Sequence, residues 1–169
     1  YLELLSTVDT VVDSTLGLGG YSETILNHFE GSRVLGIDQD LHAIDKAKER
    51  LSVFKGRFIP VHGNFRDLPI LTQEVKDRIS AVVFDLGVSN LQLTEAERGF
   101  SFQNEGPLDM RMDNSSSNEG LTAWDVINTY DSAELTKIFR EYGEDRNASR
   151  IASGIVKYRQ TKGRIDTTT

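Results

Sequence analysis

The sequence predicts an α/β fold of the Rossmann-like class, in which parallel strands alternate with helices. Three observations predict it. Four short apolar segments rich in valine, isoleucine and leucine are spaced along the first 86 residues. Segments with helical periodicity separate them, and a glycine-rich turn follows the first strand. Near-continuous apolar runs are typical of parallel strands that are covered on both faces.

The strands and helices follow one another in a regular order. Pro60 interrupts the third strand, which is typical of the edge of a sheet, and Pro69 lies near the start of the third helix. We expect strands at 8–15, 33–38, 57–62 and 81–86, with helices between them at 21–29, 40–51 and 68–79.

The pattern changes after the fourth strand. A long, glycine-dotted and charged segment without clear periodicity is typical of a functional or disordered loop. A polar stretch at 114–120 predicts a linker or surface loop, and helices are expected at 121–128, 132–142 and 145–161. Asp131 or Ser132 is the expected N-cap of the second of these helices. We therefore expect an incomplete Rossmann-like domain at 1–113 and the start of a helical domain at 114–169.

Composition excludes several classes of protein. The 169 residues carry a formal charge of −7 and include no cysteine, which excludes disulfides, cysteine zinc sites and thiol nucleophiles. No apolar run approaches the ~18 residues of a membrane-spanning helix, so we expect a soluble protein and no membrane partner. An acidic chain needs a local basic surface to bind nucleic acid. Tyr1 at one end, and a helical segment close to the other, predict a fragment of a longer protein.

The first candidate site is the glycine-rich turn Leu16–Gly20 together with Asp38. Glycines before a helix let the backbone approach a ligand, and the helix N-terminus adds positive partial charge. The spacing does not give GxGxxG in register, so a turn without a ligand stays open. Asp38 ends the second strand, 21 residues beyond Gly17, where an acid can accept hydrogen bonds from ribose hydroxyls. Together they predict a nucleoside-containing cofactor; alternatively, Asp38 caps the helix that begins near Asp40.

Two more residues follow strand ends. Phe65 comes shortly after the third strand and either flanks an adenine or lies in the core. Asp85 ends an apolar strand, and burying an unpaired carboxylate is costly. We expect it to accept a hydrogen bond from an amine of cofactor or substrate, or else from loop backbone amides.

Aromatic and basic residues then gather in two segments. The run 98–113 mixes phenylalanines, arginines and acids, which suits a flipped base, although a loop that packs its own aromatics is the alternative. The run 146–164 has six cations and no carboxylate. It is either an RNA-contacting face, with Arg146, Arg150 and Lys157 roughly together, or a solvated helix surface. The three histidines have no metal-ligand spacing, so no metal is expected.

Several motifs occur in the order typical of one family: DSTLGLGGYS, GIDQD, VHGNF, FDLGVSNLQL, ERGFSF, GPLDMRMD, EYGEDR and RIASGIV. On these motifs the chain resembles the small-subunit rRNA cytosine-N4 methyltransferases, called MraW or RsmH in bacteria, with mitochondrial relatives. The resemblance implies a class I methyltransferase that uses S-adenosyl-L-methionine (SAM), with an inserted mainly helical domain. It also implies methylation of the exocyclic amine of a cytosine in 16S-type rRNA. Family members extend beyond the position of Thr169, so the resemblance implies that this chain is the N-terminal part of a longer protein and that the C-terminal part of the sheet is missing.

The resemblance also implies site residues. Three departures from the family pattern are Leu18, where arginine is frequent, Tyr21, where histidine is usual, and Asn90-Leu91, where Ser-Pro is usual. The matched cofactor-binding positions are Gly19, Gly20, Tyr21, Asp38, Phe65, Asp85 and Gln92. By location, the candidate catalytic acceptors are Asp85, then Asp109 and Asp113. The candidate substrate contacts are Phe100 and Phe102, which could stack the base, with Arg98, Arg111, Arg146 and Arg150.

The expected partner is small-subunit rRNA or the assembled small ribosomal subunit. The expected location is the bacterial cytoplasm or, in a eukaryote, a mitochondrion or plastid; a homodimer is left open. Two rival functions remain at this point. The same glycine turn and Asp38 fit an NAD-linked oxidoreductase, and a chain that truly ended at Thr169 would suit an inactive SAM- or RNA-binding fragment.

Overall fold

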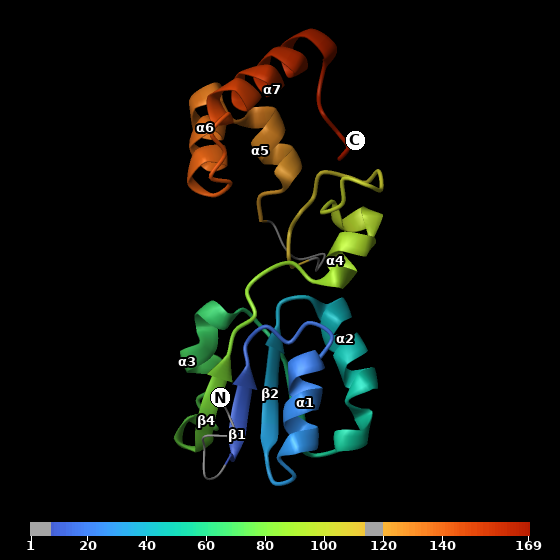
Figure 1. Cartoon of the computed structure of the whole chain (residues 1–169), viewed down its shortest axis with the longest axis vertical. Helices are drawn as coiled ribbons and strands as arrows, with labels where there is room; N and C mark the ends of the chain where they lie inside the picture. The colour runs from blue at the N-terminus through green and yellow to red at the C-terminus, as the bar shows by residue number, and fades with distance from the viewer. Residues whose placement is uncertain (1–7, 114–119) are drawn as a thin grey trace. The chain divides into compact units, whose positions relative to one another are not determined.

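The computed structural model describes residues 8–113 and 120–169, and it groups the chain into two compact units (Figure 1). The sheet unit comprises Tyr1–Ser89 with Met112–Ser116, and the helical unit comprises Asn90–Arg111 with Ser117–Thr169. The sequence predicts a single boundary near residue 114, whereas these units alternate along the chain. Where the domains of the whole protein divide stays a prediction. All but the last residue of the predicted linker at 114–120 lies outside the described residues.

Four parallel strands form the sheet, in the order β3–β2–β1–β4. Their bounds are β1 Thr10–Asp13, β2 Arg33–Asp38, β3 Phe58–His62 and β4 Ile79–Val83. Val11 in β1 pairs with Val34 of β2 on one side and with Ala81 of β4 on the other. Pro60 lies in β3, an outer strand, as the sequence predicts. The Rossmann-like α/β architecture is confirmed.

Helices cover both faces of this sheet. Successive side chains of a strand point to opposite faces, so the apolar strands offer an apolar surface on each side. Val11 packs in one cluster with Ile25 and Leu26, while Val12 belongs to a second cluster that includes Leu68 and Leu71. The helices are α1 Gly20–His28, α2 Leu41–Arg50 and α3 Leu68–Leu71. The strand order reverses between β1 and β4, and open α/β sheets bind ligands outside the carboxyl ends of strands at such a point.

The predicted helix over 68–79 is wrong in extent. α3 ends after Leu71, a 3-10 helix at Lys76–Arg78 follows, and Ile79 already belongs to β4. Leu68, Leu71 and Val75 have helical spacing in the sequence and do pack against the sheet. Their spacing therefore reflects burial on one side of a chain of short turns rather than one continuous helix.

The helical unit contains the three helices that the sequence predicts, within a few residues. Asp131 caps the middle one as expected, accepting hydrogen bonds of 2.8 Å from the N–H groups of Ala133 and Glu134. Two short helices in the segment 87–113 were not expected. The elements are α4 Asn90–Thr94, the 3-10 helix η5 Ala96–Arg98, α5 Ala123–Thr129, α6 Ser132–Glu141 and α7 Ala148–Lys162.

The last residues of the chain are bound into this unit. Pro107 and Thr167 form an antiparallel bridge, and the Trp124 indole N–H donates to the Asp166 carboxylate at 2.7 Å. Asn128 both donates to the carbonyl and accepts from the N–H of Ile165. The segment 98–111 and α5 are thus held together through residues 165–168. None of the helices in the described ranges is long and apolar enough to span a membrane.

Candidate functional site

The glycine turn shapes the ligand end of the sheet unit. Gly19 is the N-cap of α1 with φ of 79°, a left-handed conformation that favours glycine. An added Cβ would lie only 3.0 Å from Leu51 Cδ1, so the turn also packs tightly against the end of α2. No side chain caps α1. Its first N–H groups are therefore presented at the turn, where an acceptor on a ligand could bind them.

Asp38 connects this turn to the end of β2. Its carboxylate accepts hydrogen bonds from the N–H of Gly17 at 2.7 Å and of Asp40 at 2.9 Å. The side-chain cap of α2 is provided by Asp40, which accepts from His42 and Ala43. Asp38 therefore does not cap the helix, and each of its oxygens keeps a lone pair for a further donor such as a ribose hydroxyl.

Asp13, which the sequence analysis did not single out, lies at the end of β1 and is fully buried. Oδ2 accepts a 2.7 Å hydrogen bond from Ser22, whereas Oδ1 and the neighbouring Ser14 hydroxyl have no hydrogen-bond partner among the described residues. Burial raises the pKa of Asp13, the bonded Ser22 and backbone N–H groups oppose this rise, and the charge of Asp38 adds to it. An acid that ends a strand directly before a glycine turn was the available sequence signal.

Three carboxylates therefore mark the carboxyl ends of neighbouring strands. Asp13 is the last residue of β1, Asp38 is the last residue of β2, and Asp85 lies two residues beyond β4. The Asp85 N–H donates to the Thr15 hydroxyl at 2.7 Å, which ties the ends of β1 and β4 together. The Asp85 side chain is exposed. This edge of the sheet unit is negative and favours a ligand that carries positive charge.

Two phenylalanines form a right-angled corner at the same edge. The rings of Phe65 and Phe84 have centroids 5.9 Å apart and an interplanar angle of 86°, and they are 40% and 48% exposed. Such exposure leaves room for a flat ring to stack on one phenylalanine and turn its edge toward the other. Phe84 was missed because it reads as one more apolar residue of a strand; only the fold brings it to Phe65.

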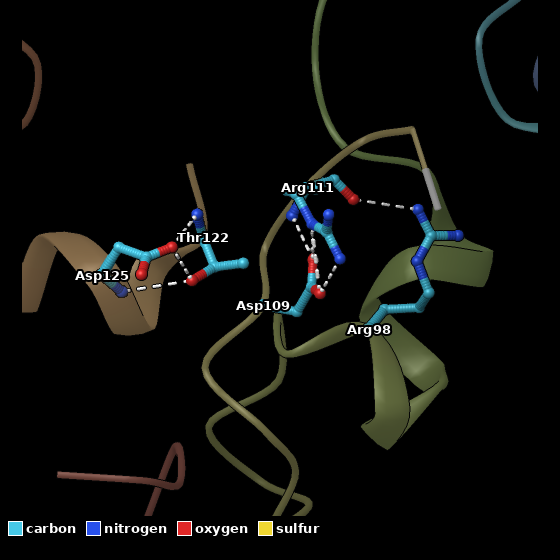
Figure 2. A network of polar contacts seen from close by, with 5 residues as sticks. All are labelled: Arg98, Asp109, Arg111, Thr122 and Asp125. Carbon is cyan, nitrogen blue, oxygen red and sulfur yellow. Dashed lines mark hydrogen bonds and ion pairs between the residues drawn. The ribbon is translucent and has the colours of Figure 1, made fainter. Parts of the chain in front are cut away.

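A second polar cluster lies in the helical unit (Figure 2). The guanidinium of Arg111 binds both oxygens of Asp109, at 2.7 to 3.2 Å, and Arg98 donates to the Arg111 carbonyl at 3.1 Å. Arg111 holds the pKa of Asp109 below its usual value. Thr122 and Asp125 form a separate capping box at the start of α5. Arg98 is only 6% exposed, so its observed contacts stabilise the segment 98–111.

The other predicted site residues are distributed over both units. Tyr21 is exposed in the first turn of α1 beside Gly20, and Asp113 is grouped with the sheet unit. In the helical unit, Gln92 is buried in α4, while Phe100 is half-buried and Phe102 is 82% exposed. Arg146 lies two residues before α7 and Arg150 lies in its first turn, and both are exposed. Within the part of the chain that the structure describes, no three histidine or acidic side chains could hold a metal ion.

The glycine turn and the acid at the next strand end define a Rossmann-like protein with a nucleoside-cofactor type of site. The chain belongs to the MraW methylase family, whose family model matches residues 3–169. The family expectation from the sequence motifs is thereby confirmed.

Two curated relatives agree with this assignment. The chain is 48% identical over 149 residues to "Ribosomal RNA small subunit methyltransferase H" of Thermobifida fusca, covering 88% of this chain and 44% of the relative. The same name is carried by a protein of Persephonella marina that is 48% identical over 159 residues, covering 94% and 53%. A solved rRNA methylase from Streptococcus thermophilus is 28% identical with a TM-score of 0.41, covering 50% and 49%. The chain thus spans about half the length of the curated relatives it matches.

Proposed function

We propose that this chain belongs to an enzyme that transfers a methyl group from SAM to the exocyclic amine of a cytosine in small-subunit rRNA. The observation that carries the proposal is the glycine turn bounded by the strand-end acids Asp13, Asp38 and Asp85. Family membership adds the reaction class, since the relatives of Thermobifida fusca and Persephonella marina are named as rRNA methyltransferases.

Charge at the sheet edge favours SAM over NAD. SAM carries a sulfonium and an ammonium, which strand-end carboxylates attract, whereas NAD carries an anionic pyrophosphate, which they repel. Asp13 tests whether a cationic cofactor such as SAM suits these residues, because its buried Oδ1 has no hydrogen-bond partner in the described residues. A cationic donor from a ligand would satisfy that oxygen and remove part of the cost of burying the charge.

In this proposal, different residues of the sheet unit bind different parts of SAM. Gly19, Gly20 and the first turn of α1 would bind through the backbone, Asp38 would accept the ribose hydroxyls, and Phe65 would stack the adenine. SAM supplies an electrophilic methyl group whose bond to sulfur breaks with the electron pair leaving on sulfur. Positioning and alignment of the amine are then the main demands on the protein.

The amine itself needs acceptors. Its lone pair is delocalised into the cytosine ring, so an acceptor on its hydrogens would raise electron density on nitrogen as the new N–C bond forms. The nitrogen afterwards gives up one proton. Asp85 is the first candidate acceptor, because its exposed carboxylate follows β4 at the ligand end of the sheet unit. Asp109 and Asp113 are the second candidates, and Asp109 would have to act while paired with Arg111.

Substrate binding falls to the helical unit in this proposal. Phe102 is available for stacking a base, since it is 82% exposed. Arg146 and Arg150 would contact phosphates, while the observed contacts of Arg98 and Arg111 assign them first to the loop that carries Phe100 and Phe102. Gln92 stays a predicted cofactor contact. We further propose that the protein acts where small ribosomal subunits are assembled, in the bacterial cytoplasm or in an organelle.

The test uses the full-length protein. Calorimetric titration with SAM, and with NAD as the control, should give binding of SAM alone. Incubation with SAM labelled in its methyl group and with small-subunit rRNA or the assembled subunit should label the RNA, and nuclease digestion with mass spectrometry should identify N4-methylcytidine. Asp38→Ala should lose SAM binding. Binding of NAD instead of SAM, or label on another base or on no RNA, would contradict the proposal.

A further inference from the structure

Exposed cations that form no ion pair with the described residues lie on α7 and directly before it. Two of the six cations in 146–164 serve inside the unit: Arg159 donates to the carbonyls of Ile127 and Tyr130, and the Arg164 guanidinium lies 5.1 Å from the Trp124 ring centroid. The remaining four are exposed, and in residues 8–113 and 120–169 none of them forms an ion pair. These are Arg146, Arg150, Lys157 and Lys162.

Packing fixes which side of α7 faces outward. Ala148 and Ala152 are fully buried where α7 packs on α6, and Arg159 reaches α5. Arg150 and Lys157 are seven residues apart, so they lie on the same side of the helix, about 10 Å apart along its axis. Both are exposed.

Two lysines of the sheet unit form ion pairs with acids of their own helix. Lys46 and Lys48 on α2 pair with Glu49 and Asp45 at 3.7 and 3.0 Å. The chain as a whole carries a charge of −7. The run 146–164, with six cations and no carboxylate, is therefore a local departure from the charge of this protein.

Between Arg150 and Lys157, one position of the helix has no side chain to cover the backbone. Gly154 lies midway between Arg150 and Lys157, and a Cβ added there would meet no atom within 4 Å. Glycine is unfavourable inside a helix, and no packing contact in the structure requires it here. Next to this position, Ile151 and Tyr158 are 39% and 52% exposed. Cations, a bare stretch of backbone and an exposed aromatic ring thus occur on one helix.

We propose that this face of α7, made of Arg150, Gly154, Lys157 and Tyr158, docks the sugar-phosphate backbone of the RNA substrate. The cations bind phosphates, Gly154 lets the strand approach the helix closely, and the Tyr158 ring stacks on a base or ribose. Phosphate contacts beside an aromatic platform are the usual way in which proteins bind single-stranded RNA. The proposal rests on the proposed function, which supplies RNA as the partner, and adds a docking surface outside the reacting centre.

The experiment measures binding of the full-length protein to an unmethylated small-subunit rRNA fragment over a range of salt concentrations. Each phosphate contact on single-stranded RNA contributes about 0.7 to the slope of log K against log salt. Arg150→Ala with Lys157→Ala should therefore lower the slope by about 1.4 and weaken binding at least tenfold at low salt. The matched control, Lys46→Ala with Lys48→Ala, removes the same charge from α2 and should leave the slope unchanged.

Gly154→Ala separates docking from folding. Alanine favours the helix, so the unfolding midpoint should rise while RNA affinity falls severalfold. Tyr158→Ala should also weaken binding, and Tyr158→Phe should restore most of it. The α7 double variant, Gly154→Ala, Tyr158→Ala and Tyr158→Phe should all bind SAM like the wild type.

Three results would overturn the docking surface. The first is a salt slope for the α7 double variant equal to that of the control. The second is unchanged RNA affinity in Gly154→Ala and Tyr158→Ala. The third is loss of binding to assembled small subunits with normal binding to naked rRNA, which would assign this face to a protein partner. Failure of the wild type to bind SAM or to methylate rRNA would instead contradict the proposed function.

Discussion

The Ser22 hydroxyl donates a 2.7 Å hydrogen bond to the Asp13 carboxylate, and both side chains are fully buried. This bond joins the first turn of α1 to the end of β1 across the glycine turn. Ser22→Ala would leave a buried carboxylate without its side-chain donor, so we expect a loss of about 1–3 kcal/mol in the free energy of unfolding. Urea denaturation measures it.

A control for this change lies in the same helix. The exposed Thr24 hydroxyl bonds only the Gly20 carbonyl one turn earlier, so Thr24→Ala should change stability by no more than about 0.5 kcal/mol. SAM affinity should fall in Ser22→Ala and stay normal in Thr24→Ala. Equal stability of the two variants would show that the Asp13–Ser22 bond does not support the turn.

Burial of Asp13 predicts an unusual pH dependence. Its pKa is raised in the folded protein, so the folded state takes up a proton before the unfolded state does as the pH falls. The contribution of this group to stability therefore increases as the pH falls from neutral toward its ordinary pKa of 3.8. Relative to Asp13→Asn, the wild type should gain stability as the pH falls from neutral toward the ordinary pKa of 3.8, measured by urea denaturation at several pH values.

For Asp109, the contribution to stability changes with pH in the opposite direction, so this residue serves as the comparison. Its pKa is lowered by Arg111, so its contribution is present above the ordinary value of 3.8 and is lost as the pH falls through the folded-state pKa. Asp109→Asn should therefore leave the slope of the free energy of unfolding against pH unchanged above pH 3.8. A constant difference between wild type and Asp13→Asn over the whole range would refute the assignment to Asp13.

Strands and helices could be predicted from the sequence where the spacing of apolar residues indicates the type of element. Asp38 was found because its distance from the glycine turn along the chain is itself informative. Phe84 and Asp13 could not be found in this way, since their significance comes from the sheet order that brings Phe65 to Phe84 and from the burial that isolates Asp13. Arg98 illustrates the reverse: an arginine beside aromatic residues predicts a substrate contact, but its side chain is buried and bonds a carbonyl.

The ion pair of Asp109 and Arg111 is expected to stabilise the loop. Arg111→Lys keeps the charge but cannot bind both carboxylate oxygens, so we expect a loss of about 0.5–1 kcal/mol for this partly exposed pair. Asp109→Asn should cost a similar amount. If Asp109 is instead a catalytic acceptor, Asp109→Asn should lower kcat by tenfold or more while Arg111→Lys lowers it little. Denaturation with single-turnover methylation kinetics separates the two roles.

Gly99 is expected to be indispensable to the same loop. It has φ of +74°, and an added Cβ would lie 2.2 Å from the Pro107 carbonyl oxygen, so the loop would have to open to admit it. Gly99→Ala should cost at least about 1–3 kcal/mol. Gly154→Ala is the matched substitution at an open helical position and should be stabilising. Similar unfolding midpoints for the two variants would contradict the close approach of the chain at Gly99.

The corner between Phe65 and Phe84 is expected to hold the adenine of SAM. If the base stacks on one ring and turns its edge to the other, both rings contribute, at about 0.5–1.5 kcal/mol each beyond simple burial. Phe65→Leu and Phe84→Leu should each weaken SAM binding two- to tenfold in calorimetric titrations, and Phe102→Leu, a change at an exposed ring of the helical unit, should not. Because the two rings touch, the double variant should lose less than the two single losses added together. Normal affinity in Phe84→Leu with reduced affinity in Phe65→Leu would leave Phe65 as the adenine contact and remove Phe84 from the site.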